Sequence, residues 1–102
     1  AIRRQRQMCI RDSYILDSMG WLNFREGRYR AAAEFTTASL KRLWDIEVAG
    51  HLVEIYAAQG KKTEALRTLH ELARQGGDDA KALVDQLAAR WKLSELPIKT
   101  AQ

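Results

Sequence analysis

The feature that most constrains the fold of this chain is a pattern of glycine and alanine that recurs after 33 positions. When the sequence is shifted by that amount, Gly27 falls on Gly60 and Ala32 falls on Ala65. The shift also superposes Met19 on Leu52, Leu22 on Ile55 and Thr36 on Leu69. A recurring unit of this length predicts one supersecondary motif used twice, with each copy covering part of the other.

Within each unit the apolar residues follow the 3.6-residue period of an amphipathic helix. The chain has one proline and few β-branched residues, so no strand pattern competes. Helices are predicted from Ser13 to about Gly27 and over residues 29–43, 46–58, 62–75 and 80–91. The predicted inward positions are Leu16, Met19, Gly20, Asn23, Ala32, Ala33, Thr36, Leu40, Leu43, Ala49, Leu52, Val53, Tyr56, Ala65, Leu66, Leu69, Leu72, Leu83, Leu87 and Trp91. Short turns between such helices favour an all-α fold of antiparallel neighbours.

Glycine and aspartate mark the predicted helix ends. Glycine takes a positive φ at little cost, and this conformation commonly ends a helix. Aspartate at an N-cap accepts hydrogen bonds from the free N–H groups of the first turn. The predicted stops are Gly27, Gly60 and the pair Gly76 and Gly77. The predicted N-caps are Asp45 for the third helix and Asp78 or Asp79 for the last.

The chain of 102 residues is expected to form one domain over residues 13–91. It divides into residues 13–45, 46–78 and 79–91, and the last part is a single helix that covers the second unit. Residues 92–102 are predicted to be a loose tail, because Pro97 forbids a simple helical continuation. No apolar run approaches the roughly 18 residues that a membrane helix needs. The first residues show no secretory signal pattern, and the lone Cys9 has no partner for an internal disulfide.

Most of the positive charge lies at the start of the chain. Residues 1–12 hold Arg3, Arg4, Arg6 and Arg11 against Asp12, so they carry +3 of the net charge of +4. The segment "RRQRQMCIRDS" resembles translated sequencing-adapter read-through, so residues 1–12 are not expected to be part of the fold. The near-neutral remainder argues against nucleic acid as the partner. The alternative hypothesis is a basic nucleic-acid-binding domain that adds Arg25, Arg28 and Arg30 to the first four arginines.

The two units resemble tetratricopeptide (TPR) repeats, which are helix–turn–helix units of about 34 residues. Gly20 and Ala32 match the pattern of that family in the first unit, and Leu52, Tyr56 and Ala65 match it in the second. The stretch "ILDSMGWLNFREGRY" is also similar to bacterial TPR proteins. The departures are Asn23 for the usual tyrosine, Val53 for the usual small residue, and Trp44 and Gly77 for proline.

The resemblance implies a place for each of the two neighbours Gly20 and Trp21. Gly20 and Ala32 would be the small residues that let paired helices approach closely. Trp21 would point about 100° away, into the concave groove that the first helix of each pair lines in this family. The implied groove residues are Tyr14, Asp17, Trp21, Phe24, Arg25, Glu47, Gly50, Glu54, Ala57 and Ala58.

This groove predicts a non-catalytic scaffold that binds a peptide or protein segment, without a cofactor. The family's carboxylate clamp is not implied, because Asp17 and Trp21 stand where it needs lysine and asparagine. Two further hypotheses remain. In the first, the aromatic residues of the first unit would pack against an upstream repeat, and the chain would be a structural segment of a longer solenoid. In the second, the chain would self-associate through its exposed apolar surface.

Candidate chemical sites are sparse. Glu47, His51 and Glu54 lie at i, i+4 and i+7, which could hold a metal, but no second helix contributes obvious ligands. His70 stands alone, and Ser18 has no base nearby in the sequence. No GxSxG, HExxH or phosphate-loop motif occurs. We therefore predict no catalytic residue and no metal site.

Overall fold

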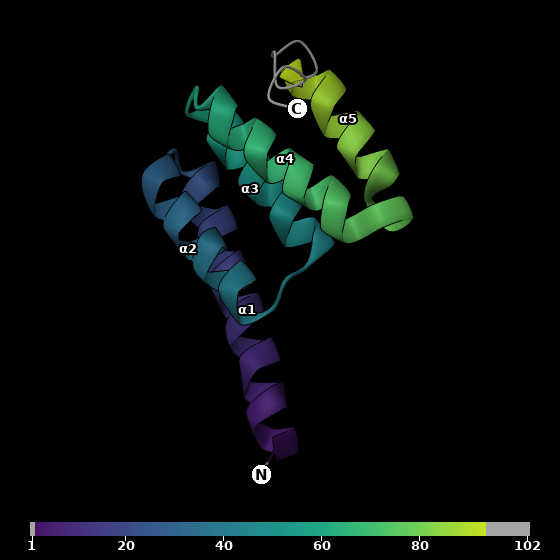
Figure 1. Cartoon of the computed structure of the whole chain (residues 1–102). Coiled ribbons are helices and arrows are strands. Elements are labelled where there is room, and N and C mark those ends of the chain that lie inside the picture. Colours follow the sequence, from purple (N-terminus) through teal and green to yellow (C-terminus); the bar gives the residue numbers. More distant parts are fainter. Residues whose placement is uncertain (1, 94–102) are drawn as a thin grey trace.

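The computed structural model describes the backbone of residues 2–93 and the side chains of residues 11–93. The elements within this range are α1 (Ile2–Arg25), α2 (Tyr29–Arg42), α3 (Ile46–Ala58), α4 (Lys62–Gly76), the short 3-10 helix η1 (Gly77–Ala80) and α5 (Lys81–Trp91). α1 pairs with α2, and α3 pairs with α4, as two helical hairpins (Figure 1). α5 packs on the second hairpin. The predicted all-α fold is confirmed.

The aspartate and glycine residues predicted at the helix ends lie there with one exception. Asp45 Oδ1 accepts hydrogen bonds from the backbone N–H of Glu47 at 2.8 Å and of Val48 at 3.3 Å. Gly27 and Gly60 both have a positive φ, +83° and +79°, in the two equivalent turns. The exception is the start of α5. Residues Gly77–Ala80 form η1 instead of a capped helix start, so neither Asp78 nor Asp79 caps α5, whose first turn has no side-chain cap.

α1 begins at Ile2, well before the predicted start at Ser13. Residues 2–12 are rich in arginine and glutamine, which favour helix without supplying an apolar face. Figure 1 shows the first part of α1 extending beyond the ends of the other helices. The exclusion of residues 1–12 from the packed fold stays a prediction.

The main core lies in the second hairpin and α5. It contains Ala49, Val53, Ala65, Leu66, Leu69, Leu72, Ala80, Leu87 and Leu93. Leu40, Trp44, Tyr56, Leu83 and Trp91 pack around it and are partly buried. The loose tail was predicted to begin at residue 92, but Leu93 is fully buried. Lys92 has a left-handed conformation with φ 57°, which ends α5 and lets the chain turn back toward the core. Residues 94–102 of the predicted tail lie outside the described part.

Two predicted inward residues are exposed. Met19 is exposed because it lies on the side of α1 that no described helix covers. Leu43 is exposed because it is the C-cap of α2, where the extended backbone (φ −155°) turns its side chain out of the helical register. Both residues continue the 3.6-residue period, so the periodicity alone assigned them to the core.

The first hairpin is held together by small and polar residues. Gly20, Ala32 and Thr36 are buried where α1 crosses α2. A Cβ at Gly20 would lie 3.2 Å from the backbone oxygen of Ala32 and 3.3 Å from the backbone nitrogen of Thr36, and would collide with Thr36 Oγ1. Toward the other end of the crossing, the hydroxyl of Ser39 donates to the backbone oxygen of Ser13 at 2.8 Å. The two hydroxyl oxygens also lie 2.9 Å apart.

This packing predicts that Gly20→Ala destabilises the protein. At an exposed helical position the same change would raise the free energy of unfolding by about 0.5–1 kcal/mol. Here the added methyl group meets backbone atoms, so we expect a fall of about 1–3 kcal/mol. Chemical denaturation measures the change, and Ser18→Ala on the exposed side of α1 is the control. A midpoint equal to or above that of the unmodified protein would contradict the close crossing.

Candidate functional site

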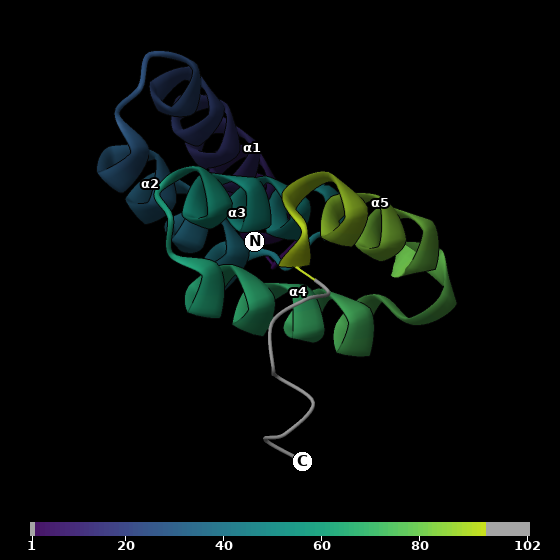
Figure 2. The ribbon, with the colours of Figure 1, turned by 90° about the horizontal axis from the view of Figure 1, so that it is seen from above.

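The first helices of the two hairpins face the same side of the molecule. Seen from above, α1, α3 and α5 lie toward one side, and α2 and α4 lie toward the other (Figure 2). We call the surface formed by α1, α3 and α5 the α1–α3–α5 face. α1 and α3 are the equivalent helices of two successive hairpins. Because stacked repeats pack in a regular way, residues one repeat apart become neighbours on this face.

A polar and aromatic contact joins α1 to α3 on this face. The Nδ1 atom of His51 lies 2.9 Å from Oδ1 of Asp17. A carboxylate only accepts hydrogen bonds, so Nδ1–H is the donor. Trp21, one turn after Asp17, stacks on the His51 ring with a centroid separation of 4.3 Å and an interplanar angle of 27°. His51 is thus held by two α1 side chains, one at its edge and one on its face.

The stacking continues along α1 toward the turn. The ring centroids of Trp21 and Phe24 lie 4.9 Å apart, and those of Phe24 and Tyr29 lie 5.5 Å apart. We call His51, Trp21, Phe24 and Tyr29 the aromatic row. It connects α3, α1 and the first residue of α2. These rings fix one another in place, because each stacked pair restricts the rotamers of both members.

A shallow pocket of about 400 Å³ opens beside the aromatic row. Its wall combines a carboxylate, a guanidinium, an indole and aliphatic carbon. The lining residues are Asp17, Ser18, Trp21, Leu22, Arg25 and His51. The guanidinium of Arg25 belongs to an exposed residue, whereas Trp21 is half-buried. A surface of this kind can take an apolar or aromatic side chain and an adjacent acidic group.

The structure brings together some of the predicted groove residues but not all. Asp17, Trp21 and Arg25 line the pocket, and Phe24 stacks with Trp21. Tyr14 and Glu47 are exposed and do not line it. Glu54 forms an ion pair with Arg90 of α5, with 3.2 Å between Glu54 Oε1 and Arg90 Nη1. The side chain of Glu54 is only 14% exposed. Its charge is therefore engaged in holding α5 against α3.

Sequence reasoning did not assign His51, Ser18 or Leu22 to the groove. It considered His51 only as a metal ligand with Glu47 and Glu54, whereas the structure turns its Nδ1 to Asp17. Asp17 and His51 are 34 positions apart, nearly one repeat, and this spacing was the available signal. Over the described side chains, no group of three or more metal-ligating residues comes together.

Ser18 lines the same pocket as His51, although the sequence offered Ser18 no base. The parts needed for acyl transfer are nevertheless incomplete in the described residues. No hydrogen bond connects the Ser18 hydroxyl to His51. Ser18 also lies in the interior of α1, so the neighbouring backbone N–H groups are engaged in helix hydrogen bonds and cannot form an oxyanion hole.

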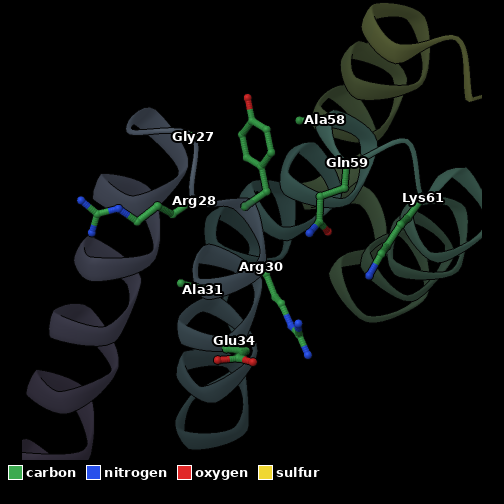
Figure 3. Close-up of a pocket in the computed structure, with 9 residues that line it drawn as sticks. Gly27, Arg28, Arg30, Ala31, Glu34, Ala58, Gln59 and Lys61 are labelled. Carbon is green, nitrogen blue, oxygen red and sulfur yellow. The ribbon is translucent and has the colours of Figure 1, made fainter.

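A second, basic pocket of about 780 Å³ lies where the turns of the two hairpins meet (Figure 3). Arg28, Arg30, Lys61 and Glu34 line it, with Gln59 at its edge. Figure 3 shows Arg30 and Lys61 on the side of Gln59, with Arg28 extending the other way. Arg28 forms an ion pair with Glu26 at 2.9 Å.

This pocket bears on the nucleic-acid alternative. Arg25, which that hypothesis grouped with Arg28 and Arg30, lies in the pocket beside the aromatic row instead. Arg11 is exposed, and the side chains of Arg3, Arg4 and Arg6 lie outside the described residues. Of the described arginines in this hypothesis, Arg28 and Arg30 thus line one pocket and Arg25 lines another. Within residues 2–93, no helix is both long and apolar enough to cross a membrane.

Comparison with known proteins supports TPR-like repeats. The chain is 49% identical over 43 residues to TPR repeat-containing protein PA4667 of Pseudomonas aeruginosa. The matched residues are 42% of this chain and span 7% of the length of that relative. No family model and no solved structure matches the chain. The hairpin geometry and this partial similarity together indicate TPR-like helical repeats.

The contact between Asp17 and His51 predicts an energetic coupling between the hairpins. In a double-mutant cycle of Asp17→Ala and His51→Ala, we expect a coupling of about 0.5–1.5 kcal/mol in the free energy of unfolding. The exposed pair Glu26–Arg28 is the control, with a coupling of about 0–0.5 kcal/mol. If the first coupling does not exceed the second, Asp17 does not hold His51 in solution.

Proposed function

We propose that the chain is a non-catalytic scaffold that binds a peptide or an extended protein segment on the α1–α3–α5 face. The observation that carries the proposal is the pocket of Asp17, Trp21 and His51, which is assembled from both hairpins. The TPR-like repeats support the same role, because helical repeats of this kind present extended concave surfaces to their partners.

The pocket is suited to anchor one residue of a partner. Trp21 and Arg25 are residue types that dominate binding energy at protein interfaces. Trp21 already stacks with both His51 and Phe24, so little side-chain entropy is lost when a partner binds. Arg25 stands at the rim, where it would favour an acidic group beside the anchoring side chain.

The arrangement favours binding over catalysis for physical reasons. The Asp17–His51 pair is engaged in structure, since it joins two hairpins and carries the stacked Trp21. The helical backbone around Ser18 offers no free N–H groups to stabilise a developing negative charge. A rigid pocket whose lining residues include no activated nucleophile is suited to bind a ligand, not to react with it.

A selected peptide tests the proposal. A random-peptide phage library is screened on the full chain, and the affinity of one synthetic, fluorescently labelled peptide is measured by anisotropy. We expect Trp21→Ala and Arg25→Ala each to weaken binding at least about tenfold, because hot-spot truncations of this kind cost 1–2 kcal/mol or more. His70→Ala, on the exposed side of α4, is the control and should leave the affinity unchanged.

Circular dichroism of each variant separates loss of binding from loss of structure. Arg25 is exposed, so Arg25→Ala should keep the full helical signal. Peptides that bind Arg25→Ala and Trp21→Ala as tightly as the unmodified chain would refute the proposal. Peptides that lose affinity only with Arg30→Ala or Lys61→Ala would assign the binding site to the basic pocket of Figure 3 instead.

A further inference from the structure

An apolar stripe on α1 is exposed to solvent. Ile15, Met19 and Leu22 lie at i, i+4 and i+7, so they share one side of the helix. Their exposed fractions are 51%, 41% and 57%. We call these three residues the α1 stripe. Large exposed apolar residues are normal when scattered, but an aligned row on one helix marks an interaction surface.

The second hairpin shows what covers such a stripe. The 33-residue repeat places Ile15, Met19 and Leu22 on Val48, Leu52 and Ile55 of α3. These three counterparts are buried, with exposed fractions of 4%, 6% and 0%. The same three positions are therefore exposed in the first repeat and covered in the second.

The first hairpin contributes to the cover on α3. Val48, Leu52 and Ile55 do not belong to the core cluster that α3 shares with α4 and α5. α3 also packs against α2 and, more lightly, against α1. Leu52 lines one pocket with Leu40 and Trp44, which come from the end of α2 and the turn after it. A preceding hairpin thus helps to bury this side of α3.

We propose that the α1 stripe is the docking surface for a preceding helical hairpin of the same kind. That hairpin would pack on α1 as the α1–α2 hairpin packs on α3, so the proposed interface continues an interface already present in this fold. The proposal rests on the packing of α3 in the second repeat, and it is tested apart from peptide binding on the α1–α3–α5 face. It assigns α1 two partners on adjoining surfaces that share Leu22, a hairpin on the stripe and a peptide beside Trp21.

The fold argues against a second copy of this chain as the occupant. A copy could continue the repeat only by offering the far side of its second hairpin to the stripe. That side is covered by α5, which packs on both α3 and α4 and is fixed by the Glu54–Arg90 ion pair. A copy would be left with a symmetric α1–α1 contact, which has no counterpart in the fold.

An extended chain tests the proposal. A copy of residues 13–45 is joined directly before Ser13 in place of residues 1–12, which reproduces the junction between Asp45 and Ile46 one repeat earlier. We expect the thermal midpoint to rise by roughly 5 °C or more, as one added interface of modest strength does in a domain of this size.

Substitutions in the original α1 identify the surface responsible. Ile15→Lys in the original copy should abolish the rise, but it should have little effect on the 102-residue chain, where Ile15 is exposed. Tyr14→Lys is the matched control, since Tyr14 is also exposed but lies about 100° around the helix. It should leave the rise intact.

The other outcomes overturn the proposal. If the extension gives no rise, or a rise that Ile15→Lys does not remove, the stripe does not receive the hairpin. Sedimentation of the 102-residue chain provides a second measurement. A dimer that Ile15→Lys returns to monomer would assign the stripe to a second copy. Peptide affinity is measured separately, so either proposal can fail without the other.

Discussion

The close approach of α1 to α2 at Gly20 is the contact on which the rest of the first hairpin depends. A Cβ at Gly20 would collide with Thr36 Oγ1 and press against the backbone of α2. With this side of α1 fixed against α2, the next residue, Trp21, is rotated by about 100° onto α3. There it stacks on His51, whose other contact is Asp17. The smallest residue and one of the largest thus stand side by side because they serve two different helix contacts.

The two hairpins obtain their stability in different ways. The second hairpin and α5 share a core of aliphatic residues, among them Val53, Leu69 and Leu72. The first has Thr36, Ser39 and Ser13 in its interior, joined in part by hydrogen bonds between the two serines. Burial of a serine removes little apolar area, and an intramolecular hydrogen bond contributes only about 0.5–1.5 kcal/mol. The first hairpin therefore depends more on its neighbours.

The sequence was informative where one residue determines one local conformation. Asp45 and the turn glycines act within a single turn, so the bounds of α3 agree with the prediction. Burial was harder to predict because it depends on which neighbours exist. Met19 continues the helical period, yet no described helix covers it. Leu93 is buried only because Lys92 reverses the chain. The pairing of Asp17 with His51 depends on how adjacent hairpins pack, which the period suggests only to within one residue.

The three sides of α1 link the two proposals energetically. One side is fixed to α2 at Gly20, a second carries the peptide pocket at Trp21, and the third carries Ile15 and Met19. A hairpin docked on the third side would hold α1 against α3, which is the contact that shapes the pocket. Ordering α1 would then lower the entropy that a peptide must remove when it binds. Binding at two sites that order the same helix is reciprocal, so a bound peptide would favour docking of the hairpin by the same factor.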